Sequence, residues 1–298
     1  FNVSGGRTDQ DHTLRCLPGI GQRLCNMGLH VGPEGEPRQC HRQFAETLLG
    51  LGVTPIAVAQ TEGYRRWVQA PELPTSVVDL GLRVEPNLEL LSQLKPDMIL
   101  ITPQFAASRP QLERIAPVHM LAIYTPEAEA YIGAQRVTRE LAELLGREAQ
   151  GEAMIARIDA TMARVKQRLA SRALPPFYVL TFLDERHVRL FGKQSIYQGV
   201  FDRVGLRNAW SGPTNYWGFS QQGIERLAEE PGAALLYLEP MPPGTVEGLA
   251  ASALWQQLPA VREQRLYGLP PVWSFNGLMA AERFANLLEA RLAPEIAP

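Results

Sequence analysis

Apolar positions along the chain switch between helical spacing and continuous runs, and this pattern predicts alternating helices and strands from residue 43 onward. A helical pattern at residues 44–52 ends at glycine, and the apolar run that follows at 53–59 is typical of a buried strand. An amphipathic helix is predicted at 86–96, with a second apolar strand after it at 97–102. Because strands alternate with helices, the pattern indicates a parallel sheet covered on both faces.

Two long helical patterns follow, at residues 127–145 and 148–171. In the second pattern the apolar residues keep helical spacing over roughly 24 residues, which corresponds to about 36 Å at about 1.5 Å per residue. These apolar residues are Met154, Ile155, Ile158, Met162, Val165 and Leu169. Because this helix follows one α/β unit and precedes another, we interpret it as a rigid connection between two lobes.

The pattern after residue 172 predicts a second α/β lobe. Strands are expected at residues 177–183, 188–191, 234–238 and 266–269, and helices at 198–204, 224–230, 254–258 and 279–292. The predicted organisation is an N-terminal lobe at 43–147, a connecting helix at 148–171 and a C-terminal lobe at 172–298. Two α/β lobes of similar size predict a ligand cleft between them.

Residues 1–42 differ from the rest of the chain. They contain all three cysteines, three of the five histidines and seven of the 25 glycines, without a periodic apolar pattern. We therefore expect an atypical, poorly ordered N-terminal segment, and we assign no strand or helix to it. Cys25, His30, Cys40 and His41 could bind a metal ion, but their spacing matches no standard zinc site and no metal is predicted.

Composition and charge exclude several classes of protein. The formal net charge is −2, whereas a nucleic-acid-binding protein would need a basic excess or stripe. No apolar run reaches the length of about 18 residues that could cross a membrane. No signal-peptide hydrophobic region precedes the first lobe, so we expect that a leader has been removed or that the start is incomplete.

Catalytic signatures are missing from the sequence. It has no GxSxG motif, no HExxH motif and no P-loop, and the glycine-containing stretch at 19–24 lacks the third glycine of a dinucleotide fingerprint. Outside the N-terminal segment only His119 and His187 remain, and His187 with Asp184 and Glu185 fits a solvated hairpin turn. We therefore predict a binding protein without catalytic residues or a cofactor. An enzyme with its active site between the lobes is the alternative from another class.

The tryptophans indicate a binding surface. Trp255 lies in a helical core pattern, whereas the other four lie in loop-like stretches near glycine, proline, asparagine or serine. These four are Trp67, Trp210, Trp217 and Trp273. Large aromatic side chains on loops usually line binding surfaces, and these four come from both halves of the chain. The pattern therefore predicts an aromatic cleft shared by the two lobes.

Several segments carry a family resemblance. They are residues 64–67, 79–91, 114–117, 208–210, 214–218 and 270–273. The most specific is Asp-Leu-Gly-Leu-Arg-Val-Glu-Pro-Asn-Leu-Glu-Leu-Leu at 79–91. In this order, from about Phe44 to the C-terminus, the segments resemble the periplasmic ferric-hydroxamate-binding proteins. The resemblance implies two α/β lobes bridged by one long helix, with little hinge closure and a shallow aromatic pocket. It also implies that the protein does no chemistry and delivers an iron(III)–siderophore complex to an ABC permease of the inner membrane.

The resemblance assigns residues to the ligand site. Arg83 matches the arginine that contacts the hydroxamate oxygens, and its planar guanidinium can reach two oxygens at once. The wall positions of the family pocket are matched by Trp67, Trp210, Trp217 and Trp273. A hydroxamate siderophore fills the coordination positions of iron with oxygen, so the resemblance requires no metal ligand and no cofactor from the protein.

Three positions depart from the family pattern. Phe105 stands where the family has a tyrosine hydroxyl donor, and Phe275 stands where it has another pocket tyrosine. Losing one hydrogen bond to a polar ligand costs on the order of 1 kcal/mol, which is about tenfold or less in affinity. Arg189 occupies a position that is apolar in a relative. We hypothesise that Arg189 replaces the lost donor or selects a more anionic siderophore.

The resemblance further implies contacts with the permease. Glu89 and Glu225 match two glutamates, one on each lobe, that meet permease arginines in the family. A periplasmic protein that acts as a monomer, with no nucleic-acid partner, is expected on the same grounds. The resemblance also requires a first strand of the N-terminal lobe within residues 1–42, where the pattern offers none.

Other ligands of the same class of protein remain open. A haem site would require an axial tyrosine, histidine or methionine in the cleft, and histidine is scarce. A triscatecholate complex carries a high negative charge, for which the cleft would offer only Arg83, Arg189 and Lys193. A cobalamin pocket is aromatic too, and it is the main alternative to a ferric hydroxamate within this class.

Overall fold

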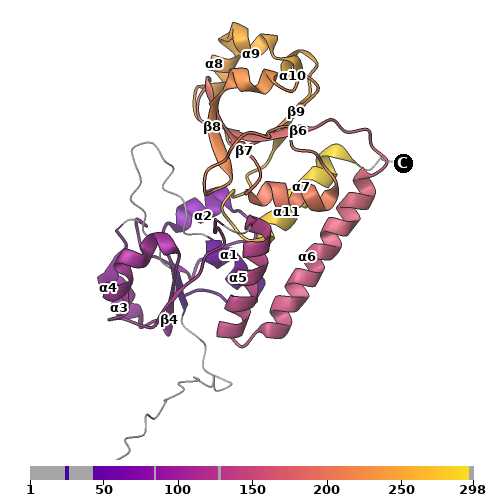
Figure 1. Ribbon diagram of the computed structural model, residues 1–298. Helices are drawn as coiled ribbons and strands as arrows, with labels where there is room; N and C mark the ends of the chain where they lie inside the picture. Colours follow the sequence, from indigo (N-terminus) through magenta and orange to yellow (C-terminus); the bar gives the residue numbers. More distant parts are fainter. Residues whose placement is uncertain (1–23, 27–42, 84, 127–128, 295–298) are drawn as a thin grey trace, which may run out of the picture.

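Two α/β lobes joined by one long helix make up the computed structural model, which describes residues 24–26, 43–83, 85–126 and 129–294 (Figure 1). Within these residues each lobe contains a five-stranded sheet. The α/β class that the sequence pattern predicts is confirmed. Both sheets carry helices around them, and the long helix α6 runs along one side of the molecule between the lobes.

The N-terminal lobe is built on a parallel sheet with the strand order β3-β2-β1-β4-β5. The strands are β1 (Leu24–Asn26), β2 (Ala57–Val58), β3 (Val78–Asp79), β4 (Met98–Ile101) and β5 (Val118–Met120). The helices are α1 (Gln43–Gly50), α2 (Thr61–Trp67), α3 (Leu88–Leu94), the 3₁₀-helix η1 (Pro103–Ser108) and α4 (Arg109–Leu112). Helix α3 begins at Leu88 because Asn87 caps it, its side-chain oxygen accepting from the Leu90 N–H at 2.9 Å.

Strand β1 corrects the expectation that no regular element precedes residue 43. It lies at the centre of the N-terminal sheet, where Cys25 pairs with Ala57 on one side and with Ile99 on the other. Three residues are too few to display a strand period, so the pattern could not identify this element. The remainder of the predicted poorly ordered segment, with His30, Cys40 and His41, lies outside the described residues.

Helices α5 (Ala130–Leu144) and α6 (Glu148–Leu169) follow the N-terminal sheet. The long helix predicted from residue 148 is confirmed, and it ends at Leu169, two residues earlier than expected. Its buried positions, among them Ile158 and Val165, face α5, α7 and α11. No helix in the described ranges has the length and apolar character needed to cross a membrane.

The C-terminal lobe has a mixed sheet with the strand order β10-β9-β6-β7-β8. The strands are β6 (Phe177–Phe182), β7 (His187–Phe191), β8 (Phe219–Gly223), β9 (Ala234–Leu238) and β10 (Leu266–Leu269). The helices are α7 (Ile196–Val204), the 3₁₀-helix η2 (Ile224–Ala228), α8 (Thr245–Ala251), α9 (Ala253–Gln257), α10 (Pro259–Arg262) and α11 (Leu278–Leu292). The four strands predicted for this lobe are confirmed to within one residue, whereas β8 was not predicted.

The two faces of the C-terminal sheet contact different parts of the molecule. Val188 and Leu190 of β7 belong to an apolar cluster within the C-terminal lobe, whereas Phe191 belongs to a larger cluster shared with the N-terminal lobe. Because side chains alternate along a strand, Arg189 lies on the same face as Phe191. The strand register pairs Arg189 with Gln221 of β8.

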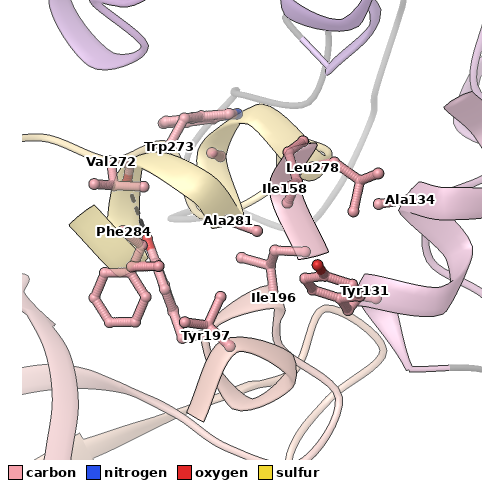
Figure 2. Packing of buried hydrophobic residues seen from close by; sticks show 14 of the residues in the cluster. Tyr131, Ala134, Ile158, Ile196, Tyr197, Val272, Trp273, Leu278, Ala281 and Phe284 are labelled. Atoms are coloured by element: carbon pink, nitrogen blue, oxygen red, sulfur yellow. Dashed lines mark hydrogen bonds between the residues drawn. The ribbon is translucent and has the colours of Figure 1, made fainter. Parts of the chain in front are cut away.

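The largest apolar cluster joins the two lobes. It includes buried residues of α1, α5 and α6 together with residues of α7, α11 and the C-terminal sheet. Helix α11 packs against α6, α7, α5 and α1, and Figure 2 shows Ala281 of α11 near Ile158 and Ile196. An ion pair between Glu282 and Arg157 also connects α11 to α6. The two lobes therefore share a core as well as a connecting helix.

Candidate functional site

Aromatic side chains from both lobes meet in one group, which we call the interlobe aromatic group. Its members are Trp67, Tyr124, Tyr216, Trp217, Trp273 and Phe275. The ring centroids of Trp67, at the end of α2, and Trp273 lie 6.1 Å apart across the lobes. The ring of Phe275 lies 5.5 Å from that of Trp273 and 5.5 Å from that of Trp217. Such distances are typical of tilted and edge-to-face aromatic contacts.

Tyr124 is a second contributor from the N-terminal lobe. Its ring lies 5.3 Å from that of Trp217 and 6.3 Å from that of Phe275. The Tyr216 hydroxyl donates a hydrogen bond to the backbone oxygen of Tyr124, which is a further contact between the lobes. The sequence reasoning missed Tyr124 and Tyr216, since a single tyrosine in a loop gives no periodic signal. For Tyr216 the one available clue was its position directly before Trp217 in the sequence.

A largely buried segment, residues 271–277, connects β10 to α11, and we call it the strap. It carries two members of the interlobe aromatic group, Trp273 and Phe275. Tyr197 of α7 donates a hydrogen bond to the backbone oxygen of Val272 at 2.9 Å (Figure 2). Tyr124 donates to the backbone oxygen of Ser274 at 2.8 Å. One tyrosine from each lobe thus fixes the path of the strap and with it the directions of its aromatic rings.

Trp217 is positioned by a tight loop before β8. The side-chain oxygen of Asn215 accepts hydrogen bonds from the backbone N–H groups of Trp217 at 2.9 Å and Phe219 at 3.3 Å. Gly218 has φ of +77°, and a Cβ at this position would lie 2.2 Å from the backbone nitrogen of Ser195. A residue with a side chain would therefore push the loop away from the start of α7 and displace the indole.

Arg83 lies in the loop between β3 and α3 and is only 2% exposed, so its guanidinium does not point to bulk water. Asp79 fixes the start of this loop by accepting a hydrogen bond from the Gly81 N–H at 2.8 Å. A cavity of about 420 Å³ opens beside the loop, and Trp67 and Leu82 are among the residues that line it. This hollow borders the aromatic group on its N-terminal side and could hold part of a ligand.

Arg189 approaches the aromatic group from the C-terminal sheet. It is 5% exposed, and its guanidinium carbon lies 4.2 Å from the ring centroid of Phe219, a cation–π distance. The Phe219 ring lies in turn 5.9 Å from that of Phe275. Arg189 therefore contacts Phe219, and Phe219 in turn contacts Phe275 of the interlobe aromatic group.

Two predicted ligand-binding residues lie elsewhere. Trp210 belongs to the apolar cluster on the other face of the C-terminal sheet, where a Cβ at Gly212 would lie 2.4 Å from its ring. Phe105 is 1% exposed and belongs to a cluster within the N-terminal lobe. The structure brings neither into the interlobe aromatic group, and a ligand contact by either stays a prediction.

The two predicted docking glutamates are exposed on opposite lobes. Glu89 lies in the first turn of α3 and accepts a hydrogen bond from Gln93 at 3.4 Å. Glu225 lies in the first turn of η2, with its carboxylate against Gly223. Neither touches the aromatic group, so both carboxylates can be tested separately from ligand binding.

Histidine and carboxylate side chains are the remaining candidates for a centre of chemistry. Among the described residues, no group of three or more histidine, cysteine, aspartate or glutamate side chains is arranged to hold a metal ion. His187 lies 2.9 Å from Asp184 in an exposed hairpin between β6 and β7. The pKa of His119 is lowered by its partial burial and, to a smaller extent, by the charge of Arg109. Neither histidine belongs to the interlobe aromatic group.

Two α/β lobes that share one connecting helix and present aromatic side chains to each other are typical of solute-binding proteins, which hold a ligand between their lobes. The chain belongs to the periplasmic binding protein family, whose model matches residues 40–272.

Named relatives are similar over most of the chain. The iron(3+)-hydroxamate-binding protein FhuD of Escherichia coli K12 is 35% identical over 244 residues, which cover 82% of each protein. The Fe(3+) dicitrate-binding periplasmic protein FecB of the same organism is 26% identical over 81% of this chain and 79% of its own. The crystal structure of FhuD from Vibrio cholerae bound to Fe3+–Desferal superposes with a TM-score of 0.82 and 29% identity, covering 94% of this chain and all of that one.

Proposed function

We propose that this protein captures an iron(III)–siderophore complex of the hydroxamate type in the periplasm and, as a monomer, delivers it to an ABC permease of the inner membrane. The observation that carries the proposal is the interlobe aromatic group, in a protein with a buried arginine in the neighbouring part of each lobe: Arg189, next to Phe219, and Arg83, in the loop that follows β3. The similarity to two FhuD proteins, one of them solved with Fe3+–Desferal, supports the same ligand class.

The site chemistry fits a ligand that brings its own metal coordination. Hydroxamate oxygens saturate iron, so the protein has to hold the organic envelope and the outward-facing oxygens. Aromatic rings supply broad apolar walls, and the planar guanidinium of Arg83 can donate to two oxygens together. Phe105 offers no hydroxyl, which leaves Arg83 and Arg189 as the proposed charged donors. We propose that binding involves no change in the chemistry of the ligand.

Tryptophan fluorescence tests the proposed binding directly. We expect ferric desferrioxamine to quench the emission with saturation at about one ligand per protein, and the iron-free compound to quench far less, because Trp67, Trp217 and Trp273 would lie against the complex. Trp67→Phe should weaken binding, whereas Trp255→Phe, in the separate cluster of the C-terminal lobe, should leave the affinity unchanged. Saturable binding of cobalamin or of a ferric triscatecholate, with none for any ferric hydroxamate, would overturn the assignment.

Delivery to the permease requires a separate test. We expect Glu89→Lys and Glu225→Lys each to abolish siderophore uptake by cells while leaving binding by the purified protein intact. Glu143→Lys, on the exposed side of α5, is the matched control and should support normal uptake. Normal uptake with either docking variant would remove that glutamate from the proposed interface.

A further inference from the structure

A buried carboxyl and a buried amide face each other where the N-terminal lobe meets the strap. Glu46 of α1 is 1% exposed, and Asn276, the penultimate residue of the strap, is 0% exposed. The amide acts on the carboxyl as a hydrogen-bonding neighbour. Yet, among the residues that the structure describes, one carboxyl oxygen and both polar atoms of the amide have no partner at regular hydrogen-bond geometry. The two groups therefore lie beside each other without being aligned.

The backbone is closely packed at the same place. A Cβ on Gly277, the residue after the amide, would lie 3.2 Å from the hydroxyl oxygen of Thr47 and 3.7 Å from Ile123. Thr47 directly follows Glu46 on α1, so the side chain of this helix residue packs close to the backbone at the end of the strap. Small rotations of the two side chains, without movement of the elements, would be enough to align them.

Burial, rather than the surrounding charges, favours the neutral form of Glu46. Burial raises the pKa of this carboxyl well above its ordinary value of 4.5, and the nearby carboxylate of Glu282 acts in the same direction. Arg283 and the amide lower the pKa, but burial is the largest effect. The Arg283 guanidinium is engaged by the backbone oxygen of Pro271 at 3.1 Å and by Gln69 at 3.0 Å. On the α2 side the neighbouring ionisable group is Tyr64, itself kept neutral by burial.

The neutral acid also matches the amide chemically. A carboxylate only accepts hydrogen bonds, so it could satisfy the Asn276 N–H but would leave the amide oxygen without a donor. A carboxylic acid offers one donor and one acceptor, as a primary amide does, and the two can form a reciprocal pair. Within the described residues no cation forms an ion pair with Glu46, and an unpaired buried carboxylate is strongly disfavoured.

We propose that Glu46 is a positioning residue for the ligand site: as a neutral acid it pairs with Asn276 and fastens the strap to helix α1. The strap carries Trp273 and Phe275, so the pair holds the C-terminal aromatic wall toward Trp67 on the other lobe. Ionisation of Glu46 would remove its donor, place a charge in the shared core and release this end of the strap. This inference rests on the proposed binding function only for its effect on affinity.

A pH series with matched variants tests the role of Glu46 in binding. For the unmodified protein we expect the affinity for ferric desferrioxamine to fall by about tenfold as the pH rises through the raised pKa of Glu46, the equivalent of losing one hydrogen bond. Glu46→Gln replaces the acid with an amide that cannot ionise, so its affinity should be independent of pH. Glu46→Ala should bind more weakly at every pH, and Glu143→Gln should keep the unmodified profile. A Glu46→Gln profile that falls as steeply as the unmodified one would overturn the proposal.

Infrared spectroscopy tests the protonation without any ligand. We expect the unmodified protein to show the carbonyl band of a protonated carboxyl at neutral pH, and Glu46→Gln to lack it. Absence of that band from the unmodified protein would refute the neutral acid even if the variants fold poorly. If the band is present but no ferric hydroxamate binds at any pH, the proposed function fails while the acid–amide pair stands.

Discussion

The hydroxyl of Tyr197 gives the sharpest test of the idea that the strap is held in place from both sides. Tyr197→Phe removes the donor to the Val272 backbone oxygen at 2.9 Å and the contact with the Ser274 hydroxyl at 3.0 Å. The phenyl ring can keep its packing on Phe191 and Phe284, whose centroids lie 4.8 Å and 4.7 Å away. Tyr197 is completely buried, and a buried acceptor left without its donor costs about 1–3 kcal/mol. We therefore expect a loss of about 1–3 kcal/mol in the free energy of unfolding.

The assay compares urea unfolding with siderophore titration for the same variant. Because the strap carries two of the aromatic rings, we expect affinity for ferric desferrioxamine to fall by up to about tenfold in parallel. Tyr178→Phe is the matched control: this tyrosine is also buried in the C-terminal lobe, but its hydroxyl reaches the Arg226 backbone oxygen only at 3.4 Å. The control should lose less than about 1 kcal/mol and bind normally. Equal losses for the two variants would refute the reasoning, since burial alone would then explain both.

Three further outcomes follow from the site. Arg83→Lys keeps the charge but loses the planar fork, so calorimetric titration should show about tenfold weaker binding of a ferric hydroxamate, and unchanged binding would remove Arg83 from the contact. Arg189→Leu should weaken binding of an anionic ferric siderophore more than that of a neutral one, and equal affinities for every siderophore tested would exclude a role in selection. Above pH 4.5 the unfolded chain ionises Glu46 while the folded protein keeps it protonated, so stability falls as the pH rises toward the raised pKa. Glu46→Gln should remove this slope of up to about 1.4 kcal/mol per pH unit in urea unfolding, and an unchanged slope would contradict it.

Periodicity predicted the elements whose pattern is long or continuous. Helix α6 has apolar residues at helical spacing along its whole length, and strands such as β4 and β9 are uninterrupted apolar runs. Strand β1 was missed because Leu24–Asn26 is too short to show a period and takes its place from pairing with two neighbours. The same limit applies to β3, which spans only Val78–Asp79.

The sequence predicted which residue types form the candidate site, but not which of those residues lie together in the fold. A tryptophan in a loop indicates that its ring packs against some surface, but the sequence does not say which surface. Trp67 and Trp273 meet across the lobes, whereas Trp210 is enclosed within one lobe. The tyrosines that hold the strap were missed because their hydrogen bonds span 150 residues for Tyr124 and 75 for Tyr197. No local pattern records such long-range pairing with backbone oxygens.

The core that extends through both lobes has a thermodynamic consequence. Its members come from α1 near the start of the described chain and from α11 at its end, so the largest apolar cluster is complete only when both lobes are present. Denaturation should therefore proceed as one cooperative transition, with the far-ultraviolet and tryptophan signals changing together. A chain cut between the lobes would yield halves that each expose a large apolar face, and they would persist in solution only when they reassemble.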